Sequence, residues 1–195
     1  MKALVIYCNP NPGSFTAHLR DQILEALQER GATVRVRDLY GDGFQPVMDR
    51  AERAGYHTPV DNERPVAGEL ADLRWCDTLI FVYPTWWFGL PAMLKGWLDR
   101  VLVPHATFSM PTETSPVRGQ LDNITTLVTI TTCGARWFQS KIIGEPGRRT
   151  ILRGMRFICH RRCRTRYAAL YRIDTSTNEN RVSFAAHVRR LVAKL

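Results

Sequence analysis

Residues 83–101 constrain the fold more than any other part of the chain. A β-rich run over residues 78–83 stops at a proline, a loop follows, and Pro91 suits the first position of an amphipathic helix because no N–H is needed there. The loop contains three consecutive aromatic residues, Trp86, Trp87 and Phe88. This order places the aromatics at the carboxyl end of a strand, where open α/β sheets bind ligands. Taken alone, they fit two roles equally well, stacking on a flat conjugated ligand or covering a hydrophobic core.

The rest of the chain alternates between strand and helix patterns. β-rich runs predict five strands, at residues 2–7, 33–36, 78–83, 123–132 and 167–173. Apolar residues at helical spacing predict helices at residues 17–30, 66–75, 91–103, 137–143, 150–155 and 178–195, with one helical turn near 47–54. The length of 195 residues suffices for one sizeable core. The chain is therefore expected to form a single α/β domain over residues 1–195, with a doubly wound parallel sheet and helices on both faces.

The turn after the first strand has the features of an anion site. Asn9 opens a run of turn formers, and Ser14 and Thr16 lie at the start of the next helix. Exposed N–H groups and the helix dipole favour an anion there, and the hydroxyls add donors. The glycine spacings of P-loops and Rossmann sites are absent. The alternative is an ordinary N-cap at Ser14, which is the commoner use of serine at such a position.

A third loop follows the fourth predicted strand. Its sequence is Thr131, Thr132, Cys133 and Gly134, a cluster of hydroxyls ending in a turn former. Because the carboxyl ends of parallel strands share one edge of a sheet, the three loops are expected to meet there.

The chain is strongly basic, with a formal net charge of +9 and a pI of about 9.8. Eight arginines and no acid lie between Arg148 and Arg166. Such a run can face nucleic-acid phosphates, an anionic dinucleotide, an acidic lipid surface or an acidic partner. No nucleic-acid-binding motif accompanies it, so we expect no nucleic-acid partner. A solvated basic face is the favoured interpretation.

The cysteines indicate a reducing compartment. Five scattered cysteines do not form a disulfide framework, so free thiols and a cytoplasmic location are expected. Cys159, His160 and Cys163 lack the second ligand pair of a zinc ribbon, so no metal site is expected. No apolar run is long enough to cross a bilayer, and the first eight residues are more typical of a buried strand than of a signal peptide.

The three loops together resemble the flavodoxin-like family of NAD(P)H quinone oxidoreductases. Residues 83–97 are similar to the family signature almost letter for letter, in the pattern Tyr-Pro-x-x-Trp-Phe-Gly-x-Pro-Ala-x-Leu-Lys-Gly-Trp. Residues 13–16 resemble the family's phosphate-gripping turn, and residues 38–46 resemble the segment after its second strand. The similarity runs from Met1 to about Gly134 and then thins.

The resemblance implies strand order 2-1-3-4-5 and a bound flavin, FMN or FAD, with NAD(P)H as co-substrate. The flavin would pass two electrons, as hydride, to quinones or similar acceptors. The implied cofactor-binding residues are Asn9, Ser14, Phe15, Thr16, Pro84, Thr85, Trp86, Trp87, Phe88, Thr131, Thr132, Cys133 and Gly134. The implied substrate pocket contains Trp87, Phe88, Phe108 and Trp137.

The chain departs from the family pattern in places that bear on chemistry. Cys133 replaces the first of two glycines. Gln139 and Glu145 fall, counting without gaps, where the vertebrate branch has a tyrosine and a histidine proposed to shuttle charge. We therefore assign no catalytic side chain. Family members are commonly homodimers whose active site borrows residues from the second subunit, and an exposed aromatic such as Phe108 fits such an interface.

Two other functions stay open. A flavodoxin-type electron carrier usually presents an acidic face, which the net charge of +9 disfavours. An ancillary or regulatory flavoprotein subunit of a membrane transporter would direct the segment from Arg148 to Arg166 at an anionic surface. The choices between FMN and FAD, between NADPH and NADH, and between quinone, azo and nitroaromatic acceptors also stay open.

Overall fold

The computed structural model describes residues 1–195 and contains a five-stranded parallel sheet of order β2-β1-β3-β4-β5. The strands are β1 (Lys2–Tyr7), β2 (Thr33–Asp38), β3 (Thr78–Thr85), β4 (Thr126–Cys133) and β5 (Arg164–Tyr171). The helices are α1 (Phe15–Glu29), α2 (Arg50–Gly55), α3 (Ala67–Trp75), α4 (Ala92–Val101), α5 (Trp137–Ile143), α6 (Pro146–Arg149) and α7 (Asn178–Val192). A π-helical segment, Thr150–Met155, continues α6. The predicted fold class and strand order are confirmed.

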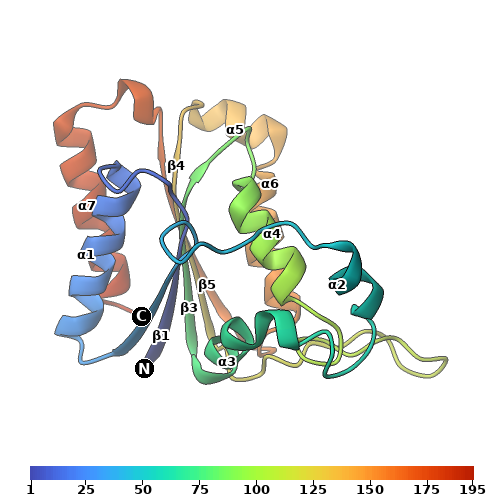
Figure 1. The fold of residues 1–195 in the computed structure, drawn as a ribbon. Coiled ribbons are helices and arrows are strands. Elements are labelled where there is room, and N and C mark those ends of the chain that lie inside the picture. Colours follow the sequence, from blue (N-terminus) through green and yellow to red (C-terminus); the bar gives the residue numbers. More distant parts are fainter.

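Helices cover both faces of the sheet. Figure 1 shows α1 and α7 on one side and α3 to α6 on the other. Alternate residues of the central strands enter two separate cores, so that Leu4 and Ile6 face one while Ala3 and Val5 face the other. The carboxyl ends of the strands lie together at the top of Figure 1, and the loops that follow them lie there as well.

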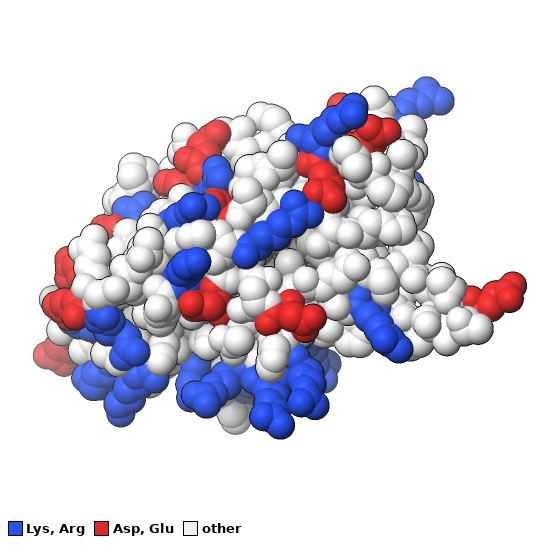
Figure 2. All heavy atoms as spheres, turned by 90° about the horizontal axis from the view of Figure 1, so that it is seen from below, with Lys and Arg blue, Asp and Glu red and all other residues white.

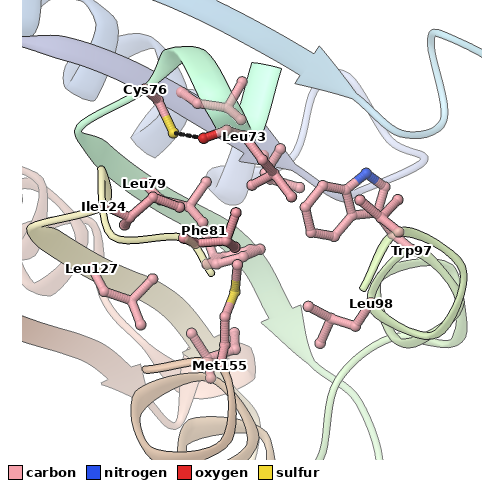
Figure 3. Close-up of a cluster of buried hydrophobic side chains, with 14 of the residues drawn as sticks. Leu73, Cys76, Leu79, Phe81, Trp97, Leu98, Ile124, Leu127 and Met155 are labelled. Carbon is pink, nitrogen blue, oxygen red and sulfur yellow. Dashed lines mark hydrogen bonds between the residues drawn. The ribbon is translucent and has the colours of Figure 1, made fainter. Parts of the chain in front are cut away.

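The core on the α4 side is built around Phe81 and Trp97, whose rings meet edge to face with centroids 6.0 Å apart (Figure 3). Gly96 lets the segment at Pro46 cross α4 at close range. A Cβ atom at Gly96 would lie 2.7 Å from Pro46 Cα, so no larger residue fits there without a shift. This packing explains the Gly-Trp pair of the sequence motif.

The observed boundaries differ from prediction mainly at the edge strand β5. That strand begins at Arg164, three residues before the predicted start, because Arg164 and Arg166 occupy exposed positions on an edge strand. β4 begins at Thr126, because Asn123 turns its amide to the carbonyls of Leu73 and Cys76 instead. Pro91 caps α4 and lies one residue before its first turn.

No helix in the structure combines the length and apolar character that crossing a bilayer requires.

Candidate functional site

The Trp86 loop is a tight two-residue turn. The N–H of Trp86 donates to the carbonyl of Gly89 at 3.3 Å, and the N–H of Gly89 donates back to Trp86 at 2.9 Å. Trp87 and Phe88 form the tip with φ angles of 47° and 61°. This left-handed backbone normally selects glycine, asparagine or aspartate, so two bulky aromatics are strained here. The Trp87 side chain is 95% exposed.

Threonine hydroxyls join the three predicted loops. Thr85 Oγ1 lies 2.9 Å from Thr131 Oγ1, which links the Trp86 turn to the end of β4. Thr16 Oγ1 lies 3.4 Å from Thr132 Oγ1, which links the start of α1 to the same strand end. The structure therefore brings residues 9–16, 84–88 and 131–134 together at one edge of the sheet, as Figure 1 shows.

The turn after β1 leaves free donors at the helix start. Ser14 caps α1, and its Oγ accepts from the N–H of Ala17 at 3.1 Å. The side chain of Asn9 shapes the turn by accepting from the N–H of Asn11. The N–H groups of Phe15 and Thr16 have no acceptor within the chain. The N-cap interpretation of Ser14 is confirmed, and the adjacent N–H groups are the donors that the predicted anion site would use.

Further unpaired donors lie around the expected position of a flat ligand. The N–H groups of Trp87, Phe88 and Gly134 have no acceptor within the chain. Gly134 lies close to the Asp174 carboxylate, because a Cβ atom there would lie 2.6 Å from Asp174 Oδ2 and this side chain would have to move. An aromatic face beside several free N–H donors, with an anion site next to it, matches the chemistry of a flavin ring and its phosphate.

Cys133 occupies the last position of β4 with its thiol buried. Its Sγ lies 3.5 Å from Ser140 Oγ of α5, so this thiol points into the protein and away from the loop surface. Cys133 therefore contacts α5 beneath the loop.

An ionic cluster with a buried carboxylate lies beneath the Trp86 turn, and the sequence pointed only to Glu145, as a departure from the family pattern. Its centre is Glu145, whose side chain is 8% exposed. Tyr171 donates to one carboxylate oxygen at 2.5 Å, and Lys141 and Arg148 donate to the other at 2.6 and 2.8 Å. The Arg148 guanidinium also lies 4.7 Å from the centre of the Tyr167 ring. We call these five residues the Glu145 cluster.

The helix that carries Arg148 touches the turn directly. Gly147 packs against the backbone of Gly89 and Leu90, so that a Cβ atom there would lie 3.1 Å from the Gly89 carbonyl carbon. Phe88 and the cluster also line a shared cavity of about 10 Å³, which is about the space one water needs. This cavity is packing space, and a ligand would lie on the outer face of the turn.

Contacts within the Glu145 cluster determine the protonation states of its carboxyl group and its two phenols. Burial acts to raise the pKa of Glu145, but the hydrogen bonds from Lys141 and then from Tyr171 and Arg148 outweigh it. They lower the pKa of this carboxyl to about 2. Burial and the adjacent carboxylate raise the pKa of Tyr171, and burial raises that of Tyr167 to about 12. At neutral pH the cluster therefore holds one carboxylate between two cations and two neutral phenols.

The two remaining pocket residues lie in different places. Trp137 begins α5 at the ligand edge and is 60% exposed. Phe108 follows the opposite end of α4, about 15 Å along that helix from the turn, and packs partly into the core. Within one chain, the structure does not bring Phe108 together with Trp87, Phe88 and Trp137.

The arginine segment splits into two groups. Arg148 belongs to the Glu145 cluster, whereas the other seven arginines are exposed and make no ion pair. These seven are Arg149, Arg153, Arg156, Arg161, Arg162, Arg164 and Arg166. Figure 2 shows basic side chains gathered along one margin of the face seen from below. Cys159 and Cys163, within this segment, are buried free thiols, and Cys159 donates to the carbonyl of Met155.

The comparisons with known proteins agree with this architecture. A family model described as flavodoxin-like fold matches residues 1–195. The chain is 34% identical over 152 residues to NAD(P)H dehydrogenase (quinone) 1 of Rattus norvegicus, which covers 69% of this chain and 54% of the rat protein. The chain spans about half the length of the curated relatives it matches.

Solved structures share the fold over the full chain. The structure of Smu.1420 from Streptococcus mutans UA159 is 26% identical, with a TM-score of 0.84 and complete coverage of both chains. An FMN-dependent NADH-azoreductase from Bacillus anthracis str. Ames Ancestor, solved in complex with FMN, is 16% identical with a TM-score of 0.80. It covers 100% of this chain and 99% of its own.

Proposed function

The chain belongs to the flavodoxin-like fold family, and on that premise we propose that it is a flavin-dependent oxidoreductase that passes two electrons from NAD(P)H to quinones or similar acceptors. The observation that carries the proposal is the exposed, left-handed Trp87–Phe88 tip beside unpaired N–H donors. A flavin, when bound, supplies the hydride chemistry, and the protein supplies binding, orientation and electrostatics.

Each part of the site has a role in this proposal. The N–H groups of Phe15 and Thr16, with the hydroxyl of Thr16, hold the flavin phosphate. The Trp86 turn and the Gly134 turn present N–H donors to the polar edge of the ring, where negative charge develops. The Glu145 carboxylate is buried and held by Lys141 and Arg148, so we assign the Glu145 cluster the role of positioning the turn and no role at the reacting atoms.

A second hollow, beside the turn that contains Ser14, bears on whether the bound flavin is FMN or FAD. This hollow measures about 360 Å³ and is lined by Ser14, Phe15, His18 and Arg181, among others. Its cationic and aromatic lining suits the extra nucleotide of FAD, whereas FMN would leave it open. The bound cofactor, identified by mass after release from the protein, distinguishes FMN from FAD.

A homodimer is part of the proposal. α5 leaves four large apolar side chains exposed: Trp137, Phe138, Ile142 and Ile143. A second copy would cover them and bring a partner Phe108 to the pocket, which a single chain does not do. Ile142→Glu is expected to give a monomer with weakened quinone reduction, as measured by sedimentation and turnover. A wild-type monomer with full activity would remove this part of the proposal.

The alternative of an ancillary membrane-associated subunit is supported by the seven unpaired arginines. Binding to anionic vesicles that disappears when Arg161, Arg162, Arg164 and Arg166 become glutamine would favour it. The five cysteines are free thiols, which supports the expected cytoplasmic location.

The first test is the visible spectrum of the purified protein before and after anaerobic addition of NADPH or NADH. A flavin spectrum that bleaches promptly, followed by reoxidation with a soluble quinone, is the expected result. Phe157→Ala removes an exposed aromatic far along the chain from the loops and is expected to change neither step. A colourless protein that takes up neither FMN nor FAD would overturn the proposal.

A further inference from the structure

A basic hollow lies beside the Glu145 cluster. It has a volume of about 340 Å³ and opens between α5, the helix that starts at Pro146, and β5. Its polar lining consists of Lys141, Glu145, Arg148, Arg149, Arg153 and Thr165. Only one lining residue, Leu152, is hydrophobic. Four cationic side chains against one carboxylate give the hollow a net positive charge, and its small apolar content excludes a quinone ring as its occupant.

Two of these cations are free to bind a ligand. The carboxylate of Glu145 is occupied by Lys141 and Arg148. Arg149 and Arg153 make no ion pair, and they lie four residues apart on successive turns of one helix, on the same side. The Arg149 guanidinium also rests against Gly144, because a Cβ atom there would lie 3.1 Å from Arg149 Cζ. The Arg149 side chain therefore lies over Gly144 at the wall of the hollow.

The donor set suits a phosphate monoester. Guanidinium groups bind phosphate through paired, charge-assisted hydrogen bonds, and the Thr165 hydroxyl from β5 adds a donor from the opposite wall. The hollow adjoins the inner side of the Trp86 turn, because Glu145 and Arg148 line both it and the small cavity under Phe88. A nucleotide whose reactive end lies against Trp87 on the outer side of the turn would extend past the turn to place a distant phosphate in this hollow.

We propose that this hollow binds the 2′-phosphate of NADPH and so selects NADPH over NADH. The inference rests on the proposed function, because it assigns the hydride donor of that reaction. It accounts for Arg149 and Arg153, two of the seven unpaired arginines, and leaves the other five to the solvated basic face.

The direct test measures binding without catalysis. Calorimetric titration compares adenosine 2′,5′-bisphosphate with adenosine 5′-monophosphate at low salt, on wild type and on two doubly substituted variants. Wild type is expected to bind the bisphosphate at least about tenfold more tightly, since each charge-assisted phosphate contact contributes about a factor of ten or more. Arg149→Gln with Arg153→Gln is expected to abolish this preference. Arg161→Gln with Arg162→Gln, an equal change of charge outside the hollow, is expected to retain it.

Equal affinity of wild type for both nucleotides would overturn the proposal, as would an equal loss in the control variant. Titration with inorganic phosphate tests whether the hollow binds free phosphate as well as the phosphate of a nucleotide. If it binds the hollow as tightly as the bisphosphate does, the hollow is a general phosphate site and the assignment to NADPH is wrong.

Kinetics separate this inference from the proposed function. In the Arg149, Arg153 variant, the ratio of kcat/KM for NADPH to that for NADH is expected to fall about tenfold. Flavin content and turnover with NADH are expected to stay at wild-type levels. Absence of turnover with either nucleotide would instead count against the proposed function, and the titrations would still decide whether the hollow prefers a 2′-phosphate.

Discussion

Replacing Glu145 with glutamine removes the charge at the centre of the cluster while nearly keeping its volume. The folded protein holds the pKa of this carboxyl at about 2, against an ordinary value of 4.5. Linkage converts that difference into about 3 kcal/mol of stability at pH 7. The side chains of Lys141 and Arg148 are 34% and 41% exposed and regain water when the carboxylate is lost, so this figure is an upper limit.

The pH dependence has a definite sign. A carboxyl whose pKa is lower in the folded state stabilises the fold above its unfolded pKa of 4.5 and loses that contribution as the pH falls toward 2. The stability difference between wild type and Glu145→Gln is therefore expected to shrink from about 3 kcal/mol at pH 7 to about 1.4 kcal/mol at pH 3.

Urea unfolding of both proteins at pH 7, 5, 4 and 3 measures this difference. Tyr171→Phe is the matched control, because it removes one hydrogen bond to the same carboxylate and leaves every charge in place. It is expected to cost about 1 kcal/mol at pH 7. A Glu145→Gln difference that stays constant from pH 7 to pH 3, or that is below the Tyr171→Phe effect, would refute the reasoning.

Three other variants test the turn, the helix packing and the cap. Trp87→Gly removes the strain of a bulky residue with left-handed backbone and is expected to raise the free energy of unfolding by about 1 kcal/mol. The same variant is expected to bind flavin at least about tenfold more weakly. A variant less stable than wild type would contradict this prediction. Gly96→Ala pushes a methyl group against Pro46 and is expected to destabilise by about 1–3 kcal/mol in thermal unfolding, whereas Gly55→Ala, which meets open space, is the neutral control. Ser14→Ala removes the α1 cap and is expected to cost about 1 kcal/mol, with unchanged Tm as the contrary result.

The central strands were predictable because their sequences leave little choice. β1 and β3 are continuous apolar runs buried on both faces, and no other element suits such short runs between turn formers. β5 was harder to delimit, since Arg164 and Arg166 begin an edge strand whose exposed positions tolerate charge. Once the strands were predicted, the loops after them could be placed at one edge of the sheet. In the structure, hydroxyl contacts of Thr16 and Thr85 join these loops.

The Glu145 cluster was not predictable from local sequence. Tyr171 lies 26 positions from Glu145 and reaches it only because β5 ends at the same edge of the sheet where α5 ends. Phe108 illustrates the opposite problem. Its aromatic character suggested the pocket, but the length of α4 carries it to the far end of the core. Contacts of this kind depend on where elements end in space, which periodicity does not specify.

The conformation of the Trp86 turn gives a physical argument for a ligand. A two-residue turn with positive φ at both central positions prefers small residues, and each bulky residue there costs free energy. Phe88 recovers part of that cost by lining the cavity above the Glu145 cluster. Trp87 recovers almost none, because its side chain is 95% exposed and touches little beyond the edge of Phe88. Glycine at position 87 would serve folding better, which supports the proposal that the exposed ring of Trp87 stacks on a flat conjugated ligand.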